Sequence, residues 1–449
     1  DLGLHGPKLG IGRQDSWLPG GAVAGQKVSL LLENILSRRS QARDFDDLPI
    51  PFRAVAADLV TGDMVVLGDG QLSMALRSSM SVPGAFDPVP RGDDLLVDGG
   101  IVRNLPVDVV RDMGADIVIA VNVEYPLLEA EDLAGLISIV SQLTTLMVAP
   151  NTAAQVASLN GNDVLIAPQL GTEFGSADFE RIREAVPVGY AAAESTGSLA
   201  NLSLAEADYA AWRSGANGCV SGLPELQFVN LDNGSRFSDD IIRRMISTRP
   251  GDTLDPERME RDLRQIHALG FIRQARYEVA EENGQPGVLI HVEPDQRGTD
   301  FIETGLEITG DSRGSSLDLK LAYLKTDLDR HGSEFRGGLQ LGQDLGLLAE
   351  YYKPLDDRLR WILKPALHAS RRDVRVFDSA GNALEEWKID EYAAELVFGS
   401  VFGRHSGLFL SVSRYAGDAA NVIGDPAREE FSFDGGEWAV EAVYDRLDN

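Results

Sequence analysis

Hydrophobic and polar positions follow three different patterns along the 449 residues of the chain. Up to about residue 210, short apolar runs alternate with stretches of helical periodicity, which is typical of α/β domains. The predicted strands are "PFRAVAADLVTG", "MVVL", "LLVDGG" and "ADIVIAVNV", and the predicted helices include "LSMALRSSMSV" and "PVDVVRDMG". We expect "ADIVIAVNV" to be a buried parallel strand because its apolar run is almost uninterrupted. Residues 1–210 are assigned to this α/β domain, and residues 211–222, which contain several Gly and Ser, to a linker.

Residues 223–295 predict a small domain in the order strand, helix, helix, strand, strand. Ser238 and Asp255 stand where helix N-caps are expected, and Pro256 follows at a first helical position. Gly270 marks the end of the second helix. Apolar residues recur at helical spacing along that helix and predict one buried face: Leu254, Met259, Leu263, Ile266 and Leu269.

Residues 299–449 show no helical pattern. Polar and apolar residues alternate in segments of roughly ten residues, and we count about eight predicted strands. In "SLDLKLAYL", for example, Leu317, Leu319 and Leu321 share one face, while Asp318 and Lys320 share the other. A soluble β-sandwich and a transmembrane β-barrel both fit this alternation, and a barrel would have an apolar outer face and a polar lumen.

The net charge and the numbers of cysteine and histidine residues argue against several classes of function. The formal net charge is −29, from 70 acidic and 41 basic residues, which argues against a nucleic-acid partner. Cys219 is the single cysteine, so an internal disulfide and a cysteine-based metal cluster are excluded. The six histidines show no ligand spacing, and we expect neither a metal nor a cofactor.

The segment "LLVDGGIVRNLPVDV", residues 95–109, places Asp98 at the end of an apolar strand and two glycines directly behind it. One interpretation is a tight turn, because Asp-Gly is a strong turn signal. The other is a catalytic base at a strand end, which would need a nucleophile elsewhere. Asp58 and Asp108 are interpreted as solvated or capping residues.

Three segments in this order resemble the patatin-like phospholipase family over about residues 45–125: "FRAVAADLVTGDMVV", "ALRSSMSVPGAFDPV" and "LLVDGGIVRNLPVDVVRDMGADIVIAVNV". The resemblance implies a Ser–Asp dyad, with the serine in a G-x-S-x-G elbow and a glycine-rich loop as the oxyanion hole. It implies that Asp98 is the general base and that Gly99 and Gly100 allow the sharp turn beside it. Asn104 and Pro106 would shape the supporting loop and open the next helix.

The two partner motifs of this dyad are expected to lie outside the chain. We expect no G-x-S-x-G elbow here, and hence neither the nucleophilic serine nor the oxyanion loop. Ser79 and Ser81 lie in "RSSMSVPG", which matches the family's segment downstream of the elbow. We therefore interpret the sequence as a fragment, truncated at both ends and inactive by itself. A degenerate domain is the alternative.

Residues 223–295 resemble a POTRA domain, and residues 299–449 then resemble the N-terminal portion of an outer-membrane β-barrel. The resulting fold class is multidomain: the C-terminal portion of an α/β patatin-like domain, a small β-α-α-β-β POTRA domain, and a partial antiparallel transmembrane β-barrel. This order resembles the type V-d patatin-like autotransporters. We expect an exposed POTRA strand edge to accept partner strands.

The resemblance implies a lipid acyl hydrolase that cleaves phospholipids or other lipid esters and is exported or anchored by its own barrel. Its partners would be the lipid substrate, outer-membrane lipid and the barrel-assembly machinery. The expected location is the bacterial outer membrane, with the patatin-like domain at the surface or secreted and the POTRA domain in the periplasm. The alternative is an outer-membrane secretion or assembly transporter that carries a catalytically dead, lipid-binding patatin domain.

Overall fold

The chain forms two compact units. One contains Gly20–Pro224, and the other combines Asp1–Pro19 with Glu225–Asn449. The computed structural model describes residues 8–10, 21–23, 25–36, 43–133, 135–171, 174, 181–217, 222–295, 297–311, 314–377, 383–402, 406–424 and 430–444. Cys219 therefore lies outside the described residues. In those ranges no helix has the length and apolar character needed to cross a membrane.

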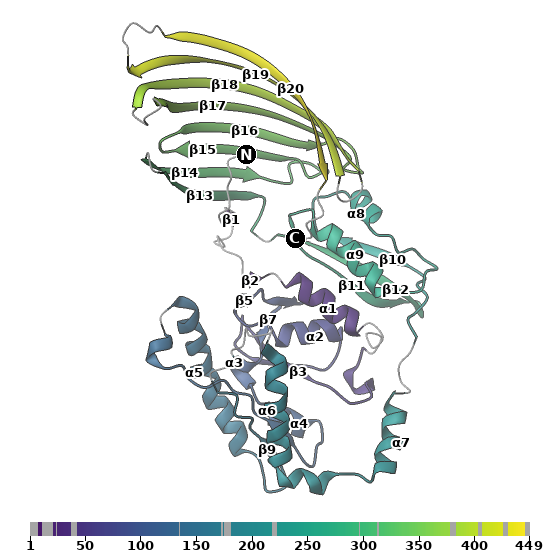
Figure 1. Cartoon of the computed structure of the whole chain (residues 1–449). Helices are drawn as coiled ribbons and strands as arrows, with labels where there is room; N and C mark the ends of the chain where they lie inside the picture. Colours follow the sequence, from purple (N-terminus) through teal and green to yellow (C-terminus); the bar gives the residue numbers. More distant parts are fainter. Residues whose placement is uncertain are drawn as a thin grey trace. The chain divides into compact units, whose positions relative to one another are not determined.

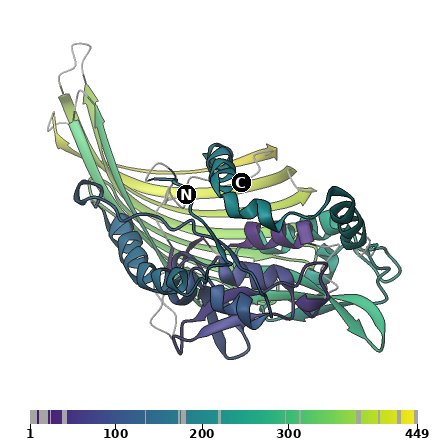
Figure 2. The ribbon, with the colours of Figure 1, turned by 90° about the horizontal axis from the view of Figure 1, so that it is seen from below.

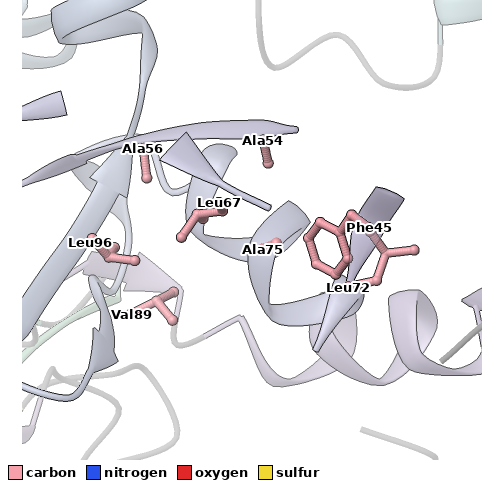
Figure 3. Close-up of a cluster of buried hydrophobic side chains, with 8 residues drawn as sticks. All are labelled: Phe45, Ala54, Ala56, Leu67, Leu72, Ala75, Val89 and Leu96. Atoms are coloured by element: carbon pink, nitrogen blue, oxygen red, sulfur yellow. The ribbon is translucent and has the colours of Figure 1, made fainter. Parts of the chain in front are cut away.

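The core of the α/β unit is a four-stranded sheet in the order β4-β3-β7-β6. Its strands are β3 (Ala54–Asp58), β4 (Met64–Leu67), β6 (Val89–Arg91) and β7 (Asp94–Asp98), and all neighbours are antiparallel. β3 is buried along its whole length, as its apolar sequence predicts. Helix α2 (Leu72–Ser79) packs on this sheet. Figure 3 shows the buried cluster between them: Phe45, Ala54, Ala56, Leu67, Leu72, Ala75, Val89 and Leu96.

The remaining elements of this unit surround that sheet (Figure 1). The strands are β2 (Gly21–Val23), β5 (Gly84–Phe86), β8 (Ile119–Val121) and β9 (Val164–Ile166). The helices are α1 (Gln26–Leu36), α3 (Gly100–Arg103), α4 (Val107–Asp112), α5 (Leu136–Ala157), α6 (Ile182–Ser195) and α7 (Glu206–Asn217). β2 pairs with β5, and β8 with β9, each in parallel.

Two expectations for this unit need correction. The predicted buried strand at residues 115–123 is reduced to β8, and Ile119 and Val121 are 50% and 49% exposed. Its sheet has only two described strands, so one edge of β8 is unpaired there. The predicted linker at residues 211–222 begins as helix, because α7 continues to Asn217. The alanines of "EADYAAWRSGAN" favour helix over the flexible segment that its Gly and Ser indicated.

Residues 223–295 form the predicted β-α-α-β-β unit. Its elements are β10 (Val229–Asn233), α8 (Asp239–Met245), α9 (Pro256–His267), β11 (Ile272–Glu282) and β12 (Gln285–Pro294), with the sheet order β10-β12-β11. The side chains of Ser238 and Asp255 accept hydrogen bonds from Ile241 N and Arg258 N, which confirms both N-caps. The predicted apolar face of α9 is buried, with Leu269 half-buried at its end.

The C-terminal part is one curved antiparallel sheet (Figures 1 and 2). Its eight consecutive strands are β13 (Asp300–Asp311), β14 (Gly314–Lys325), β15 (Glu334–Leu341), β16 (Leu345–Pro354), β17 (Trp361–Phe377), β18 (Ala383–Phe402), β19 (Ser406–Ile423) and β20 (Phe431–Tyr444). A ninth short strand, β1 (Lys8–Gly10), pairs with β13. Residues 8–10 therefore join this sheet, although the sequence pattern placed them in the α/β domain.

The register of this sheet separates an apolar face from a charged face. One row across five strands is Leu321, Leu339, Leu347, Ala369 and Tyr392. The opposite face carries cross-strand ion pairs: Lys320–Glu307 at 2.6 Å, Lys364–Glu350 at 3.2 Å and Arg336–Glu303 at 3.5 Å. The apolar face is uncovered, since Leu367 and Trp438 are 62% and 73% exposed. A soluble sandwich would bury such a face, whereas a transmembrane barrel turns it toward lipid.

Candidate active site around Asp98

Asp98 is the point where the three sequence segments meet. It ends β7 and pairs with Ala56 of β3, which belongs to the first segment. Its backbone N–H donates a hydrogen bond of 2.9 Å to the carbonyl oxygen of Ser81, which belongs to the second segment. The fold thus brings segments that are dispersed along the chain to one strand end.

The Asp98 carboxylate is half-buried. Its Oδ1 accepts a hydrogen bond of 2.8 Å from the N–H of Gly100. Within the part of the chain that the structure describes, Oδ2 accepts none. Burial raises the pKa of Asp98, and the Gly100 N–H opposes that rise. A carboxylate with one oxygen fixed, the other available and a raised pKa is suited to accept a proton from a substrate or a nucleophile.

Close packing requires a glycine at position 99 and leaves little room for a side chain at position 100. A Cβ at Gly99 would lie 2.2 Å from the carbonyl oxygen of Val55, and no side-chain movement could relieve that contact with backbone. A Cβ at Gly100 would lie 3.0 Å from Asp98 Oδ1 and 3.1 Å from Asn104 Oδ1. The chain then turns directly into α3, where Arg103 N donates to Gly99 O at 2.7 Å.

Asn104 links the Asp98 loop to α5. Its N–H donates to Asn151 Oδ1 at 3.1 Å, and its Nδ2 donates to Thr152 Oγ1 at 3.4 Å. Asn151 Nδ2 in turn donates to the carbonyl oxygens of Gly100 and Ile101, both at 3.3 Å. Asn151 and Thr152 are not among the site residues that the sequence predicts. The signal that could have found them is a polar "NT" pair inside an apolar helix.

Pro106 and Asp108 lie where α4 begins. The Pro106 carbonyl accepts from Val110 N at 3.3 Å, as expected of a residue that opens a helix. Asp108 forms an ion pair of 3.1 Å with Arg103.

Asp58 is a buried structural carboxylate. It accepts hydrogen bonds from the N–H groups of Leu95, Val60 and Thr61 at 3.0, 3.1 and 3.2 Å. These backbone donors, Leu95 first, lower the pKa of Asp58. Asp58 therefore connects the turn after β3 to the backbone of β7 by hydrogen bonds. Of the two predicted roles it has the capping one, because its side chain is buried and not solvated.

Ser79 and Ser81 of the second segment do not have the setting of a catalytic nucleophile. Ser81 is fully buried, and its Oγ donates to Arg77 O at 2.7 Å and contacts the Arg77 guanidinium. Ser79 is the last residue of α2. Neither stands between a strand and a following helix, where a nucleophile elbow would place it.

One match to G-x-S-x-G does exist outside residues 1–210. Residues 310–314, "GDSRG", fit the letters, so the expectation that the whole chain lacks the pattern is wrong. Asp311 ends β13 and pairs with Gly314 of β14, so the pattern stands between two antiparallel strands. A nucleophile elbow instead connects a strand to a helix. Ser312 itself lies outside the described residues.

Among the residues that the structure describes, no group of three or more His, Cys, Asp or Glu side chains is arranged to bind a metal ion.

Comparison with known families gives two matches along the chain. Residues 16–111 match the family of patatin-like phospholipases, and residues 224–295 match POTRA, the surface antigen variable number repeat. The chain therefore joins a segment that matches patatin-like phospholipases, a segment that matches POTRA, and a nine-stranded antiparallel sheet. Asp98, Gly99, Gly100, Asn104 and Pro106 all lie within the patatin-like segment.

Individual relatives match short stretches of the patatin-like segment. Mouse patatin-like phospholipase domain-containing protein 7 is 43% identical over 83 residues, which are 18% of this chain and 6% of that protein. An NTE family protein of Mycobacterium bovis is 46% identical over 65 residues, 14% of this chain and 11% of that protein. The match therefore spans a small part of either relative.

Two solved structures are similar over about half of the chain. BamA from Haemophilus ducreyi, lacking POTRA domains 1–3, is 14% identical with a TM-score of 0.38, covering 51% of this chain and 46% of that one. CdiB from Acinetobacter baumannii is 11% identical with a TM-score of 0.31, covering 49% and 42%.

Proposed function

We propose that the complete protein is a lipid acyl hydrolase in which Asp98 is the general base of a Ser–Asp dyad. The observation that carries this proposal is the Asp98 carboxylate itself. One oxygen is held by Gly100 N–H, the pKa is raised by burial, and the residue ends a strand where the three patatin-like segments converge. Membership of Asp98 in the patatin-like segment gives further support.

The proposed reaction is acyl transfer through serine. Asp98 takes the proton of the serine hydroxyl as the serine oxygen bonds to the ester carbonyl, and backbone N–H groups stabilise the resulting oxyanion. When the intermediate collapses, the ester C–O bond breaks and Asp98 returns the proton to the leaving alcohol. Water then cleaves the acyl-serine, with Asp98 again as base. The proposal requires a serine and oxyanion donors from sequence beyond residues 1–449.

The second part of the proposal is an outer-membrane location. The uncovered apolar face and the ion-paired opposite face of β13–β20 support a membrane-spanning barrel with a polar interior. On this proposal the POTRA repeat is periplasmic, the patatin-like domain is at the cell surface or secreted, and the barrel-assembly machinery and outer-membrane lipid are partners. The substrate is a phospholipid or another lipid ester.

The test is phospholipid hydrolysis by the full-length protein and two variants. Asp98→Asn should lower the rate by about 10²–10⁴-fold, because the general base is lost. Asp94→Asn changes a carboxylate on the same strand, four residues earlier, and should leave the rate unchanged. Normal hydrolysis by folded Asp98→Asn protein would refute the proposal. A wild-type protein that hydrolyses no lipid but displays another polypeptide at the surface would support the transporter alternative.

A further inference from the structure

Four polar side chains of helix α5 point toward the body of the α/β unit. Gln142 Oε1 accepts from Leu128 N at 2.9 Å, and Gln155 Oε1 accepts from Asp108 N at 3.1 Å. Asn151 and Thr152 hold the loop after Asp98, and Thr152 is only 1% exposed. A helix on the surface of a water-soluble domain normally shows the opposite arrangement, with its polar face outward.

The outward face of α5 is apolar. Four large side chains form a stripe along it, at spacings that place them on one side of a helix. This α5 stripe consists of Ile139, Leu143, Leu146 and Met147, which are 46%, 55%, 48% and 53% exposed.

The helix carries no charge at all. None of the 22 residues from Leu136 to Ala157 is Asp, Glu, Lys, Arg or His, although the chain contains 70 acidic and 41 basic residues. An exposed contiguous apolar surface marks an interaction site for protein or membrane. A charge-free face suits the hydrocarbon boundary of a lipid layer, because no ionised group would have to be desolvated there.

We propose that the α5 stripe enters the boundary between head groups and acyl chains of a phospholipid layer and so brings Asp98 to its lipid substrate. This inference rests on the proposed hydrolase function. The connection is direct, because Asn151 follows Met147 by about one helical turn and binds the carbonyl oxygens of Gly100 and Ile101. Helices that lie in such an interface bury their apolar face by about 5–10 Å.

The experiment measures contact between the stripe and acyl chains. The full-length protein carries Cys219→Ser, so that this cysteine does not react with the label. A fluorescent label is attached to a cysteine introduced by Leu143→Cys or Leu146→Cys. The labelled protein is then placed in phosphatidylcholine bilayers with either brominated or ordinary acyl chains. The matched control is Asp112→Cys, at an exposed position of α4. We expect bromine to quench the two stripe labels and to leave the control label unquenched.

Two results would overturn the inference. A fluorescence emission typical of a label in water would show that the α5 stripe contacts neither lipid nor protein. A shielded emission without bromine quenching would show that protein covers the stripe. Disulfide-linked dimers of unlabelled Leu146→Cys protein would then identify that protein as a second copy. The quenching needs no turnover and is measured equally in Asp98→Asn protein. Quenching without hydrolysis therefore refutes only the proposed function, and hydrolysis without quenching refutes only the inference.

Discussion

The backbone N–H of Asp98 is hydrogen-bonded to the carbonyl oxygen of Ser81 at 2.9 Å. Ser81 is fully buried and is held by Arg77, whose side chain is 2% exposed. The backbone of Asp98 is therefore fixed by a buried network, while its carboxylate stays half-exposed at the strand end. This combination holds a reactive group in place without enclosing it, as a preorganised site requires.

Asp98→Asn should stabilise the α/β unit at neutral pH. Burial raises the pKa of Asp98 above its ordinary value of 3.8, so the folded state binds this proton more tightly than the unfolded state. The free energy of unfolding of the wild type therefore falls as the pH rises from 3.8 through the higher pKa of the folded state. At higher pH it stays at this lower level. Thermal unfolding at pH 7 should give a higher midpoint for Asp98→Asn than for wild type. At an acidic pH at which Asp98 is protonated, the two midpoints should be equal. A lower midpoint at pH 7 would contradict this account.

Gly99→Ala should destabilise the α/β unit by about 1–3 kcal/mol or more, as overpacked sites do. The added methyl would lie 2.2 Å from the Val55 carbonyl oxygen, so β3 and β7 would have to separate. Gly189→Ala is the control, because a Cβ there meets nothing within 4 Å and alanine favours the helix. Urea unfolding measures both. Equal stability of Gly99→Ala and wild type would disprove the close approach.

Asp58→Ala should lower stability most strongly at neutral pH. It leaves the N–H groups of Leu95 and Val60 without their acceptor. Because the folded pKa of Asp58 is lowered, its contribution is present above the ordinary value of 3.8 and is lost as the pH falls through the folded pKa. The deficit against wild type, measured by urea midpoints, should therefore shrink on acidification. Asp93→Ala, at an exposed turn, is the control, and an equal effect of both substitutions at pH 7 would count against this role of Asp58.

Leu367→Arg and His368→Arg should differ in their effect on the C-terminal sheet, because neighbouring residues on β17 point to opposite faces. Leu367 is on the apolar face, and His368 is on the charged face, 4.0 Å from Glu395. An arginine facing lipid costs about 2–4 kcal/mol near the bilayer midplane and less toward its edges. Unfolding from lipid bilayers should show a clear loss for Leu367→Arg only. Equal tolerance of both would argue against a lipid-facing surface.

Local sequence patterns predicted most of this fold because its elements carry strong local signals. The caps Ser238 and Asp255 define the POTRA helices, and alternation of polar and apolar residues indicates the eight C-terminal strands. The prediction failed where the deciding contacts are distant. Asn151 reaches the Asp98 loop from about 50 residues away, so the polar "NT" pair can mark it as unusual in an apolar helix but cannot show which loop it binds. The exposure of Ile119 likewise depends on which strands flank β8, and an apolar run cannot show this.

The most direct test of the central claim is the rate at which a fluorophosphonate labels the nucleophile of the full-length protein. This reaction isolates activation of the serine from binding of lipid and from release of product. We predict that Asp98→Asn lowers the labelling rate by about 10²–10⁴-fold and that Asp94→Asn does not change it. Labelling of folded Asp98→Asn protein at the wild-type rate would contradict the assignment of Asp98 as the base.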